Sequence, residues 1–202
     1  MSLTSPGMSA IFSRRPSRSQ ACLTLVHSSE NRKELFQTEK YAFTLLSADP
    51  AWPSEREVAE GVALRMRRQQ RLADTVPIHL ELVMHESALH QVVGGAAVMK
   101  EQLRVLRERC DLPNVICRIL PFAAGAYPAR YGSFAHLTFE NSLAGPFSYG
   151  DVVYFEHGIG AQYIEDETDT SRYRSVFEDL RSRSLNEDES RALIENALTQ
   201  YE

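Results

Sequence analysis

The side chains of this sequence that are best suited to chemistry alternate with apolar ones along stretches that are typical of β-strands. In residues 78–86, every second position is apolar and most positions between are polar. Residues 114–122, 133–140 and 151–158 continue this period-two pattern. The side chains that we expect on the polar face, and as candidate ligand-binding residues, are His79, Glu81, His85, Arg118, His136, Tyr154 and Glu156.

Histidines, an arginine, a tyrosine and carboxylates on one sheet face indicate a cradle with acid–base capacity. A solvated sheet face normally carries Thr, Lys, Glu and Gln. Imidazole titrates near neutral pH, and a nearby carboxylate or burial shifts its pKa. An ordinary polar sheet face explains the same pattern, so both interpretations stay open. A cradle needs a cover, and residues 141–150 (NSLAGPFSYG) form the candidate lid.

No strong catalytic or metal-binding motif accompanies these residues, so catalytic residues stay unassigned. The sequence has no GxSxG elbow, phosphate-binding loop, HExxH pair or dinucleotide fingerprint. His85 and His90 are five positions apart, which does not place them on one helical face, and no third ligand is near. We therefore expect no metal and no cofactor.

Helical segments surround the predicted strands. Amphipathic or capped stretches predict helices over 34–46, 54–74, 94–111, 168–184 and 186–200. Ser54 with Glu57, and Asn186 with Glu189, have the spacing of helix-capping pairs. Residues 161–166 are a short further strand, and the connections between the later strands are too short for crossover helices. We therefore predict an α+β fold: a mostly antiparallel sheet of about five strands, helices on one face, and two N-terminal and two C-terminal helices.

Composition limits the classes of function. The chain has 202 residues, a net charge of −5 and three scattered cysteines. This charge argues against general affinity for nucleic acid, and no apolar run is long enough to span a membrane. Unpaired thiols suit the cytoplasm, where we expect the protein. Residues 1–20 are rich in Ser, Pro and Arg, so we predict a disordered tail over 1–20 and a single domain over 21–202.

Several segments together resemble one protein family. The most specific are LFQTEKYA (35–42) and LPFAAGAYP (120–128). The others are RMRRQQRL (65–72), residues 85–106, GSFAHLTFE (132–140), DVVYFE (151–156) and ESRALI (189–194). Their order is similar to the C-terminal domain of actinobacterial XRE-type helix-turn-helix regulators, a former domain of unknown function now described as antitoxin-like. Two departures are a missing helix-turn-helix pattern before the domain and Arg32-Lys33-Glu34 where the family tends to have Val-Pro-Gly.

The resemblance implies a stand-alone regulatory sensor or adaptor that binds a small effector or a small partner protein without contacting DNA. The alternative is an enzyme of actinobacterial natural-product biosynthesis, a cyclase, isomerase or dehydratase that uses acid–base residues in a pocket. Homodimerisation stays open. The segment 120–128 is expected to be a rigid connector at the sheet rim, because its Gly and Pro residues suit a tight turn; whether it lines a pocket also stays open.

Overall fold

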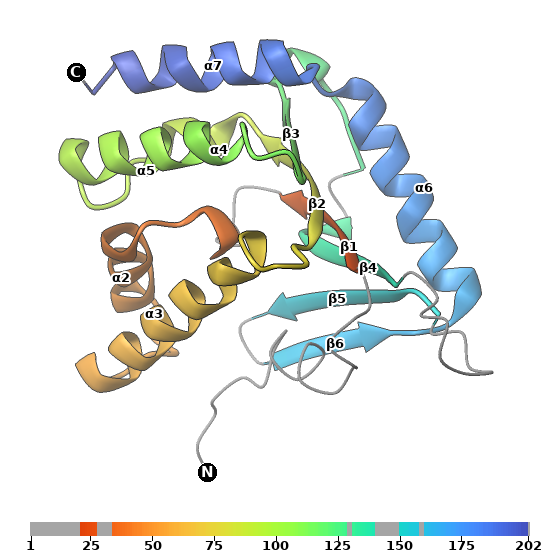
Figure 1. Ribbon diagram of the computed structural model, residues 1–202, viewed down its shortest axis with the longest axis horizontal. Helices are drawn as coiled ribbons and strands as arrows, with labels where there is room; N and C mark the ends of the chain where they lie inside the picture. The colour runs from red at the N-terminus through yellow and green to blue at the C-terminus, as the bar shows by residue number, and fades with distance from the viewer. Residues whose placement is uncertain (1–20, 28–33, 129–130, 140–149, 158–159, 202) are drawn as a thin grey trace.

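A computed structural model describes residues 21–27, 34–128, 131–139, 150–157 and 160–201 (Figure 1). The predicted tail over 1–20 and nearly all of the candidate lid lie outside these residues. The strands are β1 (Ala21–His27), β2 (His79–His85), β3 (Val115–Leu120), β4 (Phe134–Phe139), β5 (Val152–His157) and β6 (Gly160–Ile164). The helices are α2 (Glu39–Ala48), α3 (Glu55–Gln69), α4 (Ser87–His90), α5 (Ala96–Arg109), α6 (Glu167–Arg183) and α7 (Glu187–Thr199). Three 3₁₀ turns are η1 (Glu34–Phe36), η2 (Gln70–Leu72) and η3 (Phe122–Ala124).

The fold is α+β, but its sheet is mixed, so the prediction of a mostly antiparallel five-stranded sheet is wrong. The strand order is β3-β2-β1-β4-β5-β6. Strand β1 pairs in parallel with β2, and β2 in parallel with β3, while β4, β5 and β6 are antiparallel. The parallel pair β2–β3 is joined through α5, since a parallel connection needs a crossover element. Strand β1 joins the two halves by pairing antiparallel with β4.

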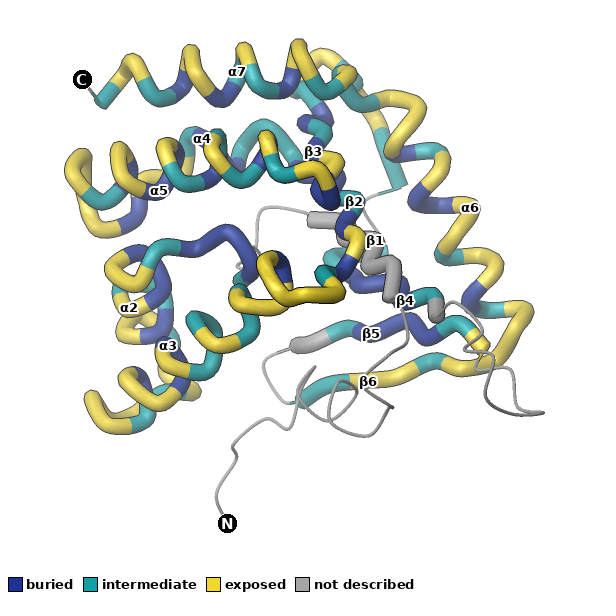
Figure 2. The backbone as a smooth tube through the Cα atoms, in the orientation of Figure 1, coloured by how far each residue is buried: buried dark blue, intermediate teal, exposed yellow. Residues whose placement is uncertain are grey.

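Helices cover both faces of the sheet, so the prediction of helices on one face is also wrong. Helices α2, α3, α5 and α7 lie on one side and α6 on the other (Figures 1 and 2). A small hydrophobic core lies between α6 and the sheet. In it, Val176, Phe177 and Leu180 of the helix pack against Val83, Phe134 and Val153 of the strands. Helix α6 begins three residues after the edge strand β6 and ends next to β3, the opposite edge, so it crosses this face. The face predicted to be polar is therefore largely a helix-packing surface.

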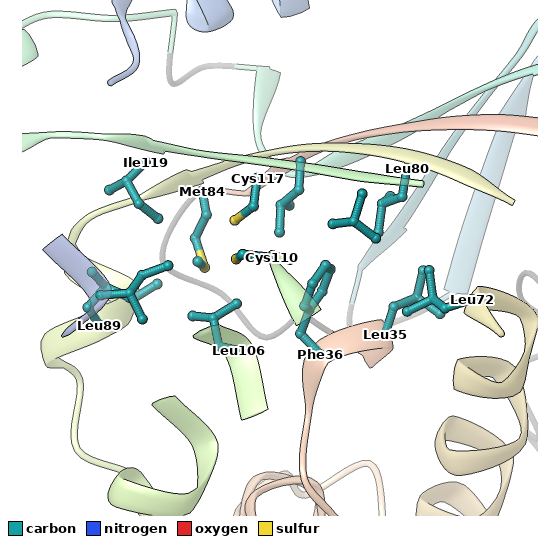
Figure 3. Close-up of a cluster of buried hydrophobic side chains, with 14 of the residues drawn as sticks. Leu35, Phe36, Leu72, Leu80, Met84, Leu89, Leu106, Cys110, Cys117 and Ile119 are labelled. Carbon is teal, nitrogen blue, oxygen red and sulfur yellow. The ribbon is translucent and has the colours of Figure 1, made fainter. Parts of the chain in front are cut away.

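The larger core lies between the sheet and the remaining helices. Strands β2 and β3 contribute the alternating apolar residues that the sequence predicts, among them Leu80, Met84 and Ile119. Figure 3 shows these side chains pointing toward Phe36 of η1 and Leu106 of α5. The alternation was predicted correctly for β2, β3 and β4, and it fixes which face of each strand is buried here.

The helix starts follow their capping residues. Ser54 accepts a hydrogen bond from the backbone N–H of Glu57, and Asn186 with Glu189 forms a reciprocal capping box, as their spacing predicts. The predicted helix over 34–46 is instead broken after Phe36, because Thr38 caps a new helix by accepting from the N–H of Tyr41.

Candidate functional site

A hollow of about 570 Å³ lies between the segment after β3 and helix α6. Its lining residues are Ala126, Tyr127, Pro128, Tyr131, Arg172, Ser175, Val176, Asp179 and Arg183. One wall therefore follows the carboxyl end of β3, and Tyr127 contacts the last residue of β2. In α/β sheets, ligands bind at the carboxyl ends of parallel strands. The connector after β3 thus lines a pocket as well as joining two strands.

Residues 121–128 (PFAAGAYP), here called the rim segment, carry no charge and reach solvent. Phe122 is 56% exposed. The N–H of Phe122 donates to Glu86 Oε2 at 2.7 Å, and Arg183 donates to the Ala126 carbonyl at 3.2 Å. Gly125 has φ of 68°, a backbone conformation that other residues rarely adopt. The rim segment is therefore held in one shape while its apolar surface is left partly open.

Arg183 of α6 lines the hollow and holds its two walls together. Its Nε and Nη2 donate to the two carboxylate oxygens of Asp179 at 2.9 and 3.0 Å. This two-point contact orients the guanidinium, and the remaining Nη1 reaches Ala126. Arg183 therefore ties α6 to the rim segment across the hollow.

His85, at the end of β2, lies behind the rim segment. Its ring contacts Phe122 edge-on at a centroid distance of 5.2 Å and Tyr127 at 5.4 Å. Its Nδ1 accepts the backbone N–H of Ser87 at 3.2 Å and lies 2.8 Å from Ser87 Oγ. Burial lowers the pKa of His85, and Glu86 opposes this only partly. The imidazole is therefore neutral at pH 7, with Nδ1 as the acceptor.

A second imidazole is buried beneath α6. His136 Nε2 lies 3.0 Å from Asp151 Oδ2, and Arg174 of α6 pairs with the same carboxylate. Burial lowers the pKa of His136, while Asp151 acts in the opposite direction. This chain of contacts ties β4 to α6 and satisfies the polar groups that α6 covers.

Glu81 and Arg118 lie under the same helix, further along the sheet. Glu81 Oε1 is 3.9 Å from Arg181 Nη1. Burial raises the pKa of Glu81, and Arg181 and Arg118 act against that rise. Arg118 Nη1 donates to the Leu185 carbonyl at a long 3.5 Å. These contacts attach the end of α6 to β2 and β3.

The predicted cradle does not form as one site. None of its residues lines the hollow, and only His85 contacts a residue that does, Tyr127. Glu81, Arg118 and His136 pair with α6 or the turn that follows it. His79 is exposed. Tyr154 is on the opposite face, because it lies across from Ala135 and packs in the larger core. Glu156 belongs to β5, but its side chain is outside the described ones.

For β5, the sequence pattern assigned the side chains to the wrong faces of the sheet. Val153 lies opposite His136, so Val153 and Phe155 face α6. The prediction that put Tyr154 and Glu156 on the polar face had placed these two residues on the apolar face instead. A continuous apolar run, Val152 to Phe155, fits either face, so the period-two pattern cannot decide between them.

Residues of the hollow that the prediction missed lie on α6, on the rim segment and at Tyr131. On α6 they follow one stripe, at positions 172, 175, 176, 179 and 183. The spacing of three and four residues was readable within the predicted helix 168–184. Its partner, the rim segment, was recognisable as eight consecutive uncharged residues.

Metal coordination and membrane insertion are two further possibilities for the described residues. In that part of the chain, no group of three His, Cys, Asp or Glu side chains is placed to hold a metal ion. Nor does any described helix combine the length and the apolar character needed to cross a membrane.

Comparison with known proteins identifies the family. Residues 19–196 match the family model described as Domain of unknown function (DUF5753), so the chain belongs to this family. The match includes every strand and most of the last helix. No curated protein and no solved structure matches the chain.

Proposed function

We propose that this DUF5753 domain is a regulatory sensor or adaptor that binds its ligand, a small partner protein or a small effector, at the hollow between the rim segment and α6. The observation that carries this proposal is the uncharged, partly exposed rim segment beside a hollow with two tyrosines. Exposed apolar surface next to a concavity is typical of binding sites. The resemblance to C-terminal domains of XRE-type, antitoxin-like regulators supports the same role.

The shape of the hollow favours a protein segment over an enclosed small molecule. The hollow lies at the surface, between an exposed connector and the exposed side chains Arg172 and Ser175 of α6. Small-molecule sites usually enclose most of their ligand. A partner that covers Phe122 and fills the hollow would remove this apolar area from water.

Site-specific photocrosslinking tests the proposal. A photoreactive residue at Ala126, which is exposed and lines the hollow, is expected to give a discrete covalent adduct in cells that express the full chain. The matched control is the same residue at Tyr163, exposed on the distant edge strand β6. Mass spectrometry identifies the adduct. No discrete adduct at position 126, or the same adduct at both positions, contradicts the proposal.

A second candidate function is acid–base catalysis, as a cyclase, isomerase or dehydratase of natural-product biosynthesis. One observation favours it: the neutral imidazole of His85 lies against Tyr127, which lines the hollow. With Nδ1 accepting from Ser87, the ring carries its proton on Nε2, which can donate a hydrogen bond to a bound substrate, as a neutral electrophilic histidine does. Under this function, His85→Gln abolishes turnover of the substrate while partner crosslinking at position 126 is absent in the wild type.

We propose further that the domain does not contact DNA itself. Its net charge of −5 supplies no excess of Lys and Arg to neutralise phosphates. In a gel-shift assay at physiological salt, the purified chain is expected to leave duplex DNA unshifted. A sequence-specific shift at nanomolar protein contradicts this.

A further inference from the structure

Three arginines converge on the segment Glu34–Gln37 on the side of the sheet opposite α6. Arg68 Nη1 contacts Glu34 Oε2 at 2.6 Å, and Arg65 Nε lies 3.6 Å from the other oxygen of that carboxylate. Arg109 of α5 donates to the Leu35 carbonyl and, at 2.7 Å, to Gln69 Oε1. Two helices thus direct guanidinium groups to one short stretch of chain.

The charges of this arginine cluster (Arg65, Arg68 and Arg109) do not balance among the described residues. Arg65 and Arg68 share one carboxylate, Glu34, which leaves an excess of one positive charge beside it. Arg109 donates to the neutral acceptors described above, and the carboxylate that acts on it is the exposed Glu108. Glu108 also pairs with Arg104, which has a second carboxylate partner in Glu101. The side chains of Arg65, Arg68 and Glu34 are only 12–14% exposed, so water screens the excess poorly. Charges at such positions are normally paired.

Arg68 also has an unsatisfied donor. Its Nε is buried and has no hydrogen-bond acceptor among the described residues. Glu34 engages Arg68 through Nη1 only, which leaves the forked edge of the guanidinium incompletely used. A guanidinium fork matches the oxygens of phosphate in a two-point contact.

We propose that the arginine cluster binds a phosphoryl group, either inorganic phosphate or the phosphate monoester of a small molecule. A phosphate monoester carries a charge near −2 at pH 7, so the excess positive charge beside Glu34 attracts it. Its oxygens accept from Arg65 and Arg68 beside Glu34. This site is separate from the hollow, because α6 and the cluster lie on opposite sides of the sheet (Figure 1).

Bound phosphate would stabilise the fold, because the cluster joins η1 to both α3 and α5. We expect the Tm of the full chain to rise by about 3 °C or more once phosphate exceeds its Kd about tenfold. Sodium chloride at equal ionic strength provides the reference. Phenyl phosphate is the monoester probe, and a larger rise with it than with inorganic phosphate assigns the site to a phosphorylated small molecule. An equal rise assigns it to free phosphate.

Two variants on adjacent positions of α3 test the location. Arg68→Lys keeps a positive charge for Glu34 but removes the fork, so phosphate affinity is expected to fall about tenfold or more. Arg67→Gln, at an exposed position, is the matched control and retains wild-type affinity. Equal phosphate effects in wild type and Arg68→Lys overturn the proposal, as does a rise no greater than that in chloride.

The wild-type chain gives an independent reading if Arg68→Lys does not fold. In ¹H–¹⁵N spectra of the arginine Nε–H groups, phosphate is expected to shift the signals of Arg65 and Arg68 and leave that of Arg67 in place. Uniform small shifts of all arginines indicate nonspecific ion binding and overturn the proposal.

Discussion

Gln102 shows how one buried side chain holds together a segment that carries the family resemblance. Its Oε1 accepts from the N–H of Thr38, and its Nε2 donates to the carbonyl of Phe36, both at 2.8 Å. Gln37, between them, is itself buried and accepts from Arg65. The Gln-Thr run is therefore fixed by helices α3 and α5, which gives it a structural role.

Gln102→Leu is expected to lower the free energy of unfolding by about 2–6 kcal/mol, because it removes the partners of two backbone groups and each loss costs about 1–3 kcal/mol. Chemical denaturation measures the change. Lys100→Ala, exposed on the same helix, is the control and changes stability by about 0.5 kcal/mol or less. A similar small effect for Gln102→Leu would contradict the bridging role.

His136 makes stability depend on pH. Burial lowers its pKa in the folded state below the ordinary value of 6.5, so the unfolded chain binds more protons just below that pH. Stability is therefore expected to be full above pH 6.5 and to fall as the pH drops below it. His136→Gln flattens this slope only in part, because the pKa of His85 is lowered too.

Urea denaturation between pH 5 and 7 measures the slope for His136→Gln. Ser171→Ala, which is exposed on α6 and changes no ionisable group, is the control and is expected to keep the wild-type slope. If His136→Gln keeps it as well, the buried imidazole is not a source of the pH dependence.

The mixture of apolar and ionisable side chains on the sheet face beneath α6 is explained by their contacts with this helix. Its apolar stripe packs on Val83, Phe134 and Val153, and its arginines pair with the acidic groups beside them. The presence of His136, Glu81 and Arg118 on the strands was predictable from the sequence. Their partners were not, because strand alternation does not say which helix crosses the face.

The hollow could not be predicted from the sequence for the same reason: local patterns do not show which elements meet in space. The sequence predicted the connector 120–128 and the helix 168–184 separately, each from its own local pattern. Their contact depends on the path of α6 from β6 to β3, and that path follows from strand order. The sequence does not reveal strand order, since a five-residue apolar run such as CLTLV (22–26) gives no sign that it forms the central strand β1.

Phe177→Ala tests the packing of α6. Phe177 is 3% exposed in the core beneath this helix, and its truncation is expected to cost about 3–5 kcal/mol of unfolding free energy. Thermal or urea unfolding measures the loss. Ser171→Ala, exposed on the same helix, is the control. A loss below about 1 kcal/mol would show that α6 does not cover the sheet.

Across the molecule, β1 is the element on which both halves of the sheet depend. It lies between β2, which leads into the parallel half, and β4, which leads into the antiparallel half. The larger core spans both halves, from Ile119 of β3 to Tyr154 of β5, so β1 must be in place for that core to close. A six-stranded sheet divided at β1 would expose two new edges.

Thr24→Pro, in the middle of β1, is therefore expected to abolish cooperative unfolding of the whole domain. Thr24 lies opposite Glu81 on one side and His136 on the other. Proline removes one ladder hydrogen bond, and its ring does not fit a central strand. Gln162→Pro, in the edge strand β6, makes the same chemical change where only β5 is paired, and is expected to lower the Tm while leaving a single cooperative transition. Circular dichroism melts and amide hydrogen exchange in β2 and β4 compare the two variants. Native-like protection of β2 and β4 in Thr24→Pro would show that the two halves of the sheet hold together without β1.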